Sequence, residues 1–222
     1  MKPIEAYELS KMYREGTHDI VAVRSASFQA AEGEIVAIMG PSGSGKTTLL
    51  SMLGCILRPT GGQISICGQR VDRLTENQLP PVRRNHIGFI FQNYNLFGAL
   101  TALENVLVAL KLKGITGQAA RREGLRLLDA VGLADRAHSV PRDMSGGQKQ
   151  RVSVARALAG EPPLVLADEP TANLDWKSGS QVIELLRDAA KVQGRTVVLV
   201  THDHRVDPYI DRTVTIEDGV LQ

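Results

Sequence analysis

The sequence contains no long apolar run. Segments such as residues 35–39 end within a few positions at a glycine or a charged side chain, whereas a helix that crosses a bilayer needs about 20 apolar residues in succession. The first residues also lack the apolar stretch and small-residue cleavage pattern of a secretory signal. We therefore expect a cytoplasmic chain that meets a membrane only peripherally, at its cytoplasmic face.

Cysteines are scarce, and charge of one sign is not in excess. Cys55 and Cys67 lie in apolar stretches without C-x-x-C or Cys/His spacing, which is typical of reduced, buried thiols. Lys and Arg total 26 against 24 for Asp and Glu. The basic doublets at 83–84 and 121–122 are typical of solvated faces. This balance argues against a general nucleic-acid-binding surface.

The sequence does contain short β-rich runs separated by longer stretches with helical spacing. Runs at 35–39, 87–91, 164–167 and 197–200 predict an α/β fold with a mainly parallel sheet covered by helices. Alternating segments at 4–13, 21–30 and 63–71 indicate a smaller flanking antiparallel sheet. Helical spacing dominates between 97 and 159, which predicts a helical subdomain inserted in the core of a single domain, 1–222.

The segment 40–47 matches the G-x-x-x-x-G-K-[ST] loop, directly after an apolar run and before a helical run at 48–57. Glycines let backbone N–H groups turn inward around an anion, and a helix start adds its positive dipole end. Lys46 would contact the β- and γ-phosphates, and Thr47 would ligate Mg²⁺. This predicts a P-loop NTPase (RecA-like) core. Its expected nucleotide-binding residues are Gly40, Pro41, Ser42, Gly43, Ser44, Gly45, Lys46, Thr47 and Thr48.

Two adjacent acids, Asp168 and Glu169, follow the apolar run 164–167. In open α/β sheets such strand ends face the ligand crevice. We expect Asp168 to hold Mg²⁺, directly or through water, and Glu169 to polarise a water for attack on the γ-phosphate. An acid pair at a strand end is weak evidence alone, but it becomes strong beside a P-loop.

Residues 144–148 have the sequence Met-Ser-Gly-Gly-Gln and open another helical run. Ser145 and Gln148 have the spacing of a capping box, so a purely structural helix start is one interpretation. A second anion site at this helix start is the other. The segment resembles the signature Leu-Ser-Gly-Gly-Gln of the ATP-binding cassette (ABC) family, and it lies, as in that family, between the P-loop and the acid-ended strand.

Other positions extend the resemblance from residue 13 to about residue 219. Gln92 follows the run 87–91, the sequence Ala-Asn-Leu-Asp at 172–175 follows Glu169, and His202 follows the run 197–200. Tyr13 matches the aromatic residue that stacks on adenine, although a cross-strand aromatic contact would also explain it. Met144 stands where the family usually has Leu, and Ala172 where the subgroup below often has Gly or Ser.

The resemblance implies an ATP-binding and ATP-hydrolysing subunit that uses Mg²⁺ and dimerises on ATP. Gln92 would sense Mg²⁺ and the γ-phosphate, and His202 would contact the γ-phosphate. The implied catalytic residues are Glu169, His202, Lys46 and Gln92, and the implied metal ligands are Thr47, Gln92 and Asp168.

The same resemblance implies a nucleotide site shared between two chains. Asp175 would reach across the dimer. The signature residues would bind the γ-phosphate of the nucleotide held by the other subunit's Lys46. These residues are Ser145, Gly146, Gly147 and Gln148.

Within the family, residues 91–97, 100–106 and 144–151 are most similar to ATPases of lipoprotein-release, macrolide-export and glycolipid-export systems. The implied partner is a separate integral membrane permease. The implied ATPase contacts neither nucleic acid nor the transported substrate.

Three alternative functions fit the sequence less well. A soluble ABC ATPase of DNA repair or translation would bring a coiled-coil insertion or two cassettes in one chain, and the sequence has neither. A GTPase or small-molecule kinase would need a guanine-reading Asn-Lys-x-Asp segment or a phosphate-acceptor lid. The sequence has no Asn-Lys-x-Asp, and such enzymes do not use a Ser-Gly-Gly-Gln helix. A catalytically dead subunit is disfavoured because Lys46, Asp168, Glu169 and His202 are all present.

Overall fold

A central sheet runs through the molecule. The computed structural model describes residues 2–16 and 18–222, and in these residues the strand order of this sheet is β10-β9-β3-β8-β7-β6. All neighbours pair in parallel except β10, which is antiparallel to β9. The strands are β3 (Ile35–Met39), β6 (Ile87–Ile90), β7 (Leu164–Asp168), β8 (Thr196–Thr201), β9 (Arg212–Glu217) and β10 (Val220–Leu221).

The central strands are buried on both faces, as a parallel sheet covered by other layers requires. In β3, Ile35, Ala37 and Met39 belong to one core, while Val36 and Ile38 belong to the other. The same alternation in β7 and β8 follows from the two-residue period of a strand. The sheet therefore separates two hydrophobic cores.

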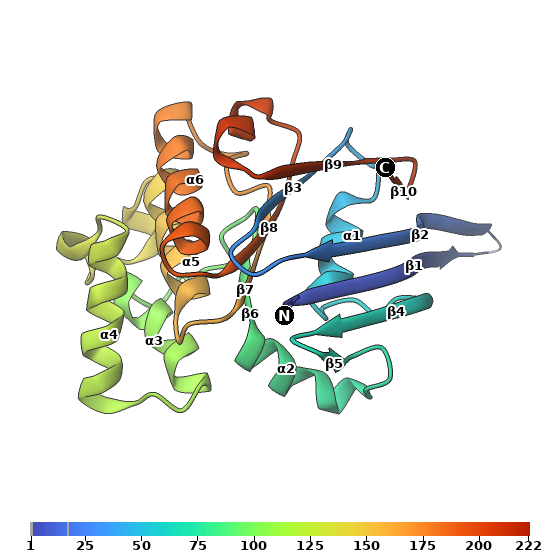
Figure 1. The fold of residues 1–222 in the computed structure, drawn as a ribbon. Coiled ribbons are helices and arrows are strands. Elements are labelled where there is room, and N and C mark those ends of the chain that lie inside the picture. Colours follow the sequence, from blue (N-terminus) through green and yellow to red (C-terminus); the bar gives the residue numbers. More distant parts are fainter. Residues whose placement is uncertain (1, 17) are drawn as a thin grey trace.

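An antiparallel sheet lies over one of these cores. Its order is β2-β1-β4-β5 in the described part of the chain, and helix α1 (Lys46–Leu53) packs in the core beneath it. Figure 1 shows this sheet on the side opposite α3 and α4. The strands are β1 (Ile4–Glu15), β2 (His18–Ala30), β4 (Gly61–Ile66) and β5 (Gln69–Arg70).

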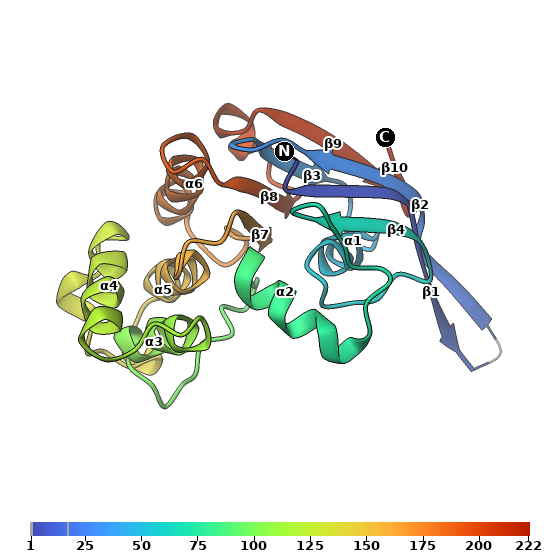
Figure 2. The ribbon, with the colours of Figure 1, turned by 60° about the horizontal axis from the view of Figure 1, so that its bottom comes forward.

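Helices cover the other core. Three of them follow one another between β6 and β7, and α3 and α4 stand apart from the antiparallel sheet in both ribbon views (Figures 1 and 2). The helices that cover this core are α3 (Ala102–Leu112), α4 (Gly117–Ala130), α5 (Gly146–Leu158) and α6 (Trp176–Lys191), whereas α2 (Leu79–His86) packs in the core beneath the antiparallel sheet. The short 3₁₀ helices are η1 (Glu76–Gln78), η2 (Ala134–Arg136), η3 (Pro141–Asp143) and η4 (His204–Tyr209).

A buried asparagine fixes the entry to these helices. Thr101 caps α3 in a capping box with Glu104. Asn105 accepts a hydrogen bond from the backbone N of Phe97 and donates to the carbonyl oxygens of Phe97, Leu100 and Thr101. Because every polar atom of this buried amide is paired, the loop before α3 has one defined shape.

The α/β fold class expected from the sequence is confirmed, with three local corrections. The helix expected at 48–57 ends at Leu53, because Gly54 is its C-cap and Cys55 has a φ of 55°. Strand β9 was not anticipated, since only two of its six residues are buried. Cys55 is buried as expected, whereas Cys67 is only partly so.

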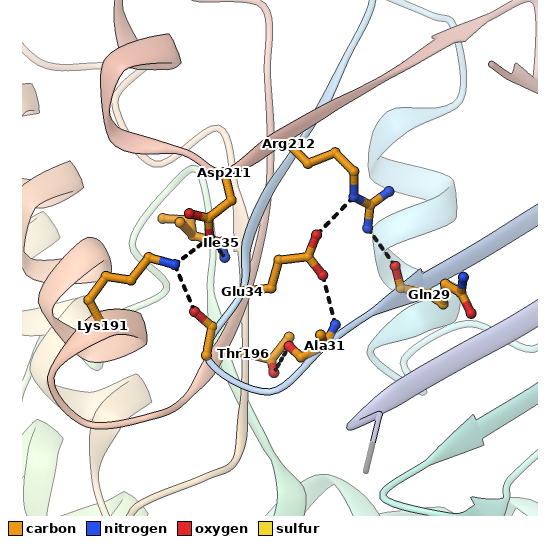
Figure 3. A network of polar contacts seen from close by, with 9 residues as sticks. Gln29, Ala31, Glu34, Ile35, Lys191, Thr196, Asp211 and Arg212 are labelled. Atoms are coloured by element: carbon orange, nitrogen blue, oxygen red, sulfur yellow. Dashed lines mark hydrogen bonds and ion pairs between the residues drawn. The ribbon is translucent and has the colours of Figure 1, made fainter.

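A polar network braces the sheet at the edge where its parallel strands begin (Figure 3). Asp211 accepts hydrogen bonds from the backbone N of Ile35 and from Lys191 at the end of α6. Arg212 donates to Glu34 at 2.8 Å and to the carbonyl of Gln29 at the end of β2. The network therefore ties both sheets and α6 together.

In the part of the chain that the structure describes, no helix combines the length and apolarity that crossing a membrane requires.

Asp72 organises the turn between the short strands of the antiparallel sheet. It accepts hydrogen bonds from the backbone N of Ile64 at 3.0 Å and from Arg70 at 2.8 and 2.7 Å. The Arg70 guanidinium lowers the pKa of Asp72 from 3.8 to about 2. A group with a depressed pKa stabilises the fold fully above its unfolded pKa, and this contribution is lost as the pH falls towards the folded value.

We predict that Asp72→Asn lowers the free energy of unfolding by about 1–2 kcal/mol at pH 7 and that this difference shrinks between pH 4 and pH 2. Urea denaturation at several pH values measures it. Asp135→Asn is the control, because the Asp135 carboxylate is 75% exposed beside Arg136 and exposed pairs contribute about 0–1 kcal/mol. A constant difference between wild type and Asp72→Asn across the pH range would contradict the prediction.

Candidate nucleotide site

Three neighbouring strands of the central sheet end side by side, and each is followed by an expected site residue. Met39 pairs with Thr201, and Asp168 pairs with Val200. Gly40, His202 and Glu169 come directly after β3, β8 and β7, which lie in that order. The strand register alone therefore brings the loop after β3 next to two segments that lie more than 120 residues further along the sequence, at the edge where ligands bind in α/β sheets.

The loop after β3 folds closely against β2. Gly45 has a φ of 102°, and a Cβ at this position would collide with the carbonyl oxygen of Ala22. Only glycine combines that backbone conformation with that approach. The loop therefore lies directly against β2, and α1 begins at Lys46, the residue after this glycine.

Helix α1, like α2 and α4, has no side-chain cap at its N-terminus. Its N-cap is Gly45. By contrast, Ser145 caps α5 and Asp175 caps α6. The first N–H groups of α1 therefore remain available to an anion, which the helix dipole also favours.

Lys46 supplies a buried positive charge to the same loop. Its residue is 7% exposed, and its Nζ donates to the carbonyl oxygens of Gly40 at 2.7 Å and Pro41 at 2.8 Å. The Oγ of Ser44 is buried without a hydrogen-bond partner among the described residues. Such a group is suited to a ligand rather than to the fold.

A cavity of about 280 Å³ opens at this loop. Glu169 lies in its wall although it follows β7, so the structure brings this acid to the P-loop. The lining residues are Ala22, Ser42, Gly43, Gly45, Lys46, Thr47, Thr48 and Glu169.

Asp168 and Thr47 meet beside this cavity. The hydroxyl of Thr47 donates to Oδ1 of Asp168 at 3.0 Å. Burial raises the pKa of Asp168, while the hydrogen bond from Thr47 acts in the opposite direction. The pair joins α1 to β7 and presents a hydroxyl and a carboxylate, both hard oxygen donors of the kind that Mg²⁺ prefers.

Glu169 is held in an unusual backbone conformation. Its φ is 44°, which is uncommon for a residue with a side chain. Its Oε1 lies 2.9 Å from Nδ1 of His202. The other oxygen, Oε2, is buried without a hydrogen-bond partner in the described part of the chain. Glu169 therefore has one oxygen oriented by His202 and one able to accept a proton.

Gln92 lies beyond β6 at the same sheet edge, but it does not line the cavity at the P-loop. Its carbonyl accepts a hydrogen bond from Asn173. Tyr94 and Asn95 follow with φ of 61° and 47°, and both carbonyls accept hydrogen bonds from Arg156 of α5. No sequence motif identifies Arg156, because only the folded loop supplies its acceptors.

The signature segment and Asp175 do not line the cavity either. Ser145 and Gln148 form the expected capping box. A Cβ on Gly147 would lie 3.0 Å from Ser178 at the start of α6. Within one chain, these residues are therefore packed on α6 and away from the P-loop.

Tyr13 is 40% exposed and pairs with Ile20 across the β1–β2 hairpin. Lys11 lies over its ring, with Nζ 5.3 Å from the centroid. Ala22, which lines the cavity, is two residues from Ile20. The expected adenine-stacking residue is thus paired with a strand that reaches the cavity, and its ring is partly open to solvent.

Residues 23–172 match the sequence profile of the ABC transporter family. The chain belongs to this family. It is an ATP-binding, ATP-hydrolysing cassette, and the family resemblance seen in the sequence is confirmed.

Relatives of the cassette include an uncharacterized ABC transporter ATP-binding protein of Thermotoga maritima. It is 46% identical over 221 residues, which cover 100% of this chain and 94% of the relative. The macrolide export ATP-binding/permease protein MacB of Pectobacterium atrosepticum is 43% identical over 211 residues. That match covers 95% of this chain and 32% of MacB, so the cassette corresponds to about a third of the MacB chain.

Among solved structures, the cassette is similar to MJ0796 of Methanocaldococcus jannaschii. A dimeric post-hydrolysis state of the ATP-binding cassette MJ0796, bound to ADP and Pi, has a TM-score of 0.93 and 40% identity. The superposition covers 99% of this chain and 96% of that one. The whole fold of this cassette is therefore shared.

We predict that Lys46→Ala weakens ATP binding about 10- to 100-fold, because a charge-assisted hydrogen bond to phosphate is worth about 1.5–3 kcal/mol. Titration with a fluorescent ATP analogue measures the dissociation constant. Lys111→Ala, which removes an exposed lysine of α3, should bind as wild type does. Unchanged affinity in Lys46→Ala would mean that the backbone N–H groups of the loop carry the binding without Lys46.

Proposed function

We propose that this cassette works as a homodimer that closes on ATP and drives a separate membrane-spanning permease, in export or in lipid or lipoprotein release. The observation that carries the proposal is the placement of two sets of site residues at different places on one chain. Lys46 and Glu169 line the cavity, whereas the signature segment, at the start of α5, packs against the first turn of α6. A second copy is the economical way to bring the two sets to one nucleotide, and the MJ0796 neighbours are described as dimeric.

In this proposal the P-loop binds the phosphates. The uncapped N-terminus of α1 and the N–H groups of residues 40–47 surround them, and Lys46 exchanges its bonds to loop carbonyls for bonds to phosphate oxygens. The unpartnered Oγ of Ser44 supports this role. Tyr13 stacks on the base. This role is supported by its cross-strand partner Ile20, which lies two residues before Ala22 in the cavity wall.

Mg²⁺ fits the residues at the cavity. Thr47 and Asp168 would hold it, with Gln92 approaching from the loop after β6. Bound there, the ion would neutralise charge on the β- and γ-phosphates. The supporting observation is the contact between a hydroxyl and a buried carboxylate, since both are oxygen donors suited to this cation.

Glu169 is the proposed general base. His202 fixes the Oε1 side of its carboxylate, and Oε2 is left to accept a proton from the attacking water. A base oriented by a second residue needs less rearrangement in the transition state. His202 would also contact the γ-phosphate, since its side chain is 64% exposed at the sheet edge.

The signature residues and Asp175 act on the nucleotide of the second copy. Ser145 and Gly146, with the neighbouring Gly147 and Gln148, would complete the γ-phosphate site from the partner, and Asp175 would reach across the interface. The capping bonds of Ser145 and Asp175 support this role, because they keep both helix starts rigid before the second chain arrives.

The permease would dock in an apolar groove of about 480 Å³ between α2, β6, α3 and α5. Phe97 and Leu112, which line it, are 52% and 63% exposed. Arg83, Arg84 and Lys113 supply positive charge at the same groove, and burial lowers the pKa of Lys113 to about 8. A short amphipathic helix with an acidic residue fits this combination. MacB relatives carry a permease in the same chain, which supports such a partner.

The groove also supports the proposed division of the domain. We propose that residues 97–159 form a helical subdomain inserted in a single ABC domain, 1–222, and that α3 and α5 of this subdomain form one wall of the groove. Arg156 links the groove to the loop after Gln92. A partner that moves the subdomain would therefore shift Gln92 as well. In this proposal the cassette acts at the cytoplasmic face of a membrane.

We predict that Glu169→Gln binds ATP with near wild-type affinity but lowers turnover about 10²- to 10⁴-fold, because the amide cannot accept a proton. With turnover blocked, MgATP should hold the protein as a dimer. Size-exclusion chromatography with light scattering reads the mass, and MgADP is the control. A monomer at micromolar protein and millimolar MgATP would count against the homodimer.

We predict that Ser145→Asp abolishes hydrolysis but leaves ATP binding intact, because a carboxylate facing the γ-phosphate repels it. Aspartate is as good an N-cap as serine, so α5 should remain folded. Ser145→Asn keeps the cap without the charge and should retain most activity.

Mixing Ser145→Asp with Lys46→Ala tests whether the site is shared. In a mixed dimer both defects fall in one site and the other site is intact. Phosphate release should therefore appear on mixing, at a fraction of the wild-type rate, although each parent is inactive. Mixtures that stay as inactive as their parents at every ratio would contradict sites that are shared and able to act singly.

A further inference from the structure

The first turn of α6 contacts the signature segment. Asp175 accepts hydrogen bonds from the backbone N of Ser178 at 3.0 Å and from its Oγ at 2.8 Å. Ser178 lies against Gly147, since a Cβ on that glycine would be 3.0 Å from the serine side chain. A movement of this turn would therefore displace both Asp175 and Gly147.

The same turn also contacts the loop that carries His202. Trp176 follows Asp175 directly, and the guanidinium carbon of Arg205 lies 4.7 Å from the centroid of its ring. This distance is within the range of a cation–π contact. Arg205 belongs to η4, only three residues beyond His202.

Asp203 holds the other side of the Arg205 guanidinium. Nε of Arg205 donates to Oδ1 at 2.8 Å, and Nη2 donates to Oδ2 at 2.7 Å. These bonds hold the pKa of Asp203 below its usual range. The backbone N of Asp203 donates to Oγ1 of Thr201, the last residue of β8. His202 therefore lies inside a short segment that is anchored at both ends.

We propose that Arg205 is a positioning residue for ATP hydrolysis. By pairing with Asp203 and stacking on Trp176, it holds residues 202–205 against the first turn of α6. His202 then keeps its contact with Glu169 while Asp175 and Gly147 approach the nucleotide of the second copy. The inference rests on the proposed function and adds Arg205 and Trp176 to the residues expected from the sequence.

The exposure of Arg205 separates positioning from folding. The Arg205 side chain is 59% exposed, although that of its partner Asp203 is only 17% exposed, and an ion pair or cation–π contact made by a solvent-exposed guanidinium contributes little to global stability. Removing Arg205 should therefore leave the melting temperature within about 3 °C of wild type. The geometry of His202 and Glu169 is more sensitive, since a misplacement of about 1 Å can lower a rate 10²-fold.

Steady-state ATPase assays and fluorescent-nucleotide titrations test the proposal. Arg205→Ala should lower kcat about 10-fold and leave the nucleotide dissociation constant within about twofold of wild type. Arg205→Lys keeps the charge but loses the bidentate contact with Asp203, so its kcat should lie between that of Arg205→Ala and that of wild type. Arg136→Ala is the matched control, because it removes a half-exposed arginine that pairs with the adjacent Asp135, and it should keep wild-type kcat.

A double-mutant cycle tests the contact itself. Trp176→Leu should lower kcat as much as Arg205→Ala does, and the double variant should be no slower than either single variant, because both changes break one contact. Trp176→Phe keeps an aromatic face under Arg205, so this single variant should retain most of the wild-type kcat.

Fluorescence gives a readout that does not depend on turnover. Trp176 is the single tryptophan of the sequence, so its emission reports on this turn alone. In a Glu169→Gln background, MgATP should change that emission, and Arg205→Ala should reduce the amplitude of the change by at least half.

The outcomes are distinct. Wild-type kcat in Arg205→Ala, or single-variant losses that multiply in the double variant, would overturn the positioning role while leaving the proposed function intact. If the melting temperature of Arg205→Ala is well below that of wild type, two milder variants decide the question. The positioning role stands if Arg205→Lys lowers kcat at a wild-type melting temperature and Trp176→Phe retains most of the rate, and it fails if kcat follows the melting temperature in both. A wild-type protein that neither hydrolyses ATP nor dimerises would instead refute the proposed function, and this inference with it.

Discussion

The register of β3, β8 and β7 is the constraint on which the rest of the site depends. Because Met39 pairs with Thr201 and Asp168 pairs with Val200, the residues that follow these strands emerge side by side. A shift of one residue in any pairing would turn buried side chains to the wrong face. The strands cannot slip, since alternate residues fill two different hydrophobic cores. Packing therefore fixes the positions of the P-loop, Glu169 and His202.

Two contacts then convert this frame into a chemical site. The Thr47–Asp168 hydrogen bond joins α1 to β7 and holds a carboxylate in a buried position that raises its pKa. The hydrogen bond from the Glu169 backbone N to the Val200 carbonyl continues the ladder, which helps to maintain a left-handed conformation that costs on the order of 1–3 kcal/mol. That conformation turns the Glu169 side chain from the line of the strand towards the P-loop cavity.

The N-termini of α1, α5 and α6 differ in whether a side chain caps them. The start of α1 has no side-chain cap, so its N–H groups can bind phosphate. The starts of α5 and α6 are capped by Ser145 and Asp175. Their N–H groups are partly satisfied, and their side chains are fixed before a second chain is present. In a shared site, such rigidity reduces the entropy lost when the two halves meet.

The sequence by itself determined the P-loop, the acid pair and the signature segment. Each is a short run whose chemistry depends on neighbours within a few residues, as with Gly45 and Lys46 or the capping box of Ser145 and Gln148. The family followed from their order and spacing. Short apolar runs predicted the central sheet, and alternating segments predicted the antiparallel one. The roles assigned to individual site residues remain predictions.

Only the tertiary structure decided which distant segments meet. The Arg156 contacts to the loop after Gln92, the Arg205 contact with Trp176, and strand β9 between β3 and β10 join residues from different elements, and no local pattern specifies them. The tertiary structure also decided that the signature segment packs against the first turn of α6 and not at the P-loop cavity. The physical reason is that such contacts arise when whole helices and sheets pack to bury two cores, and a charged or aromatic side chain acquires its partner only then.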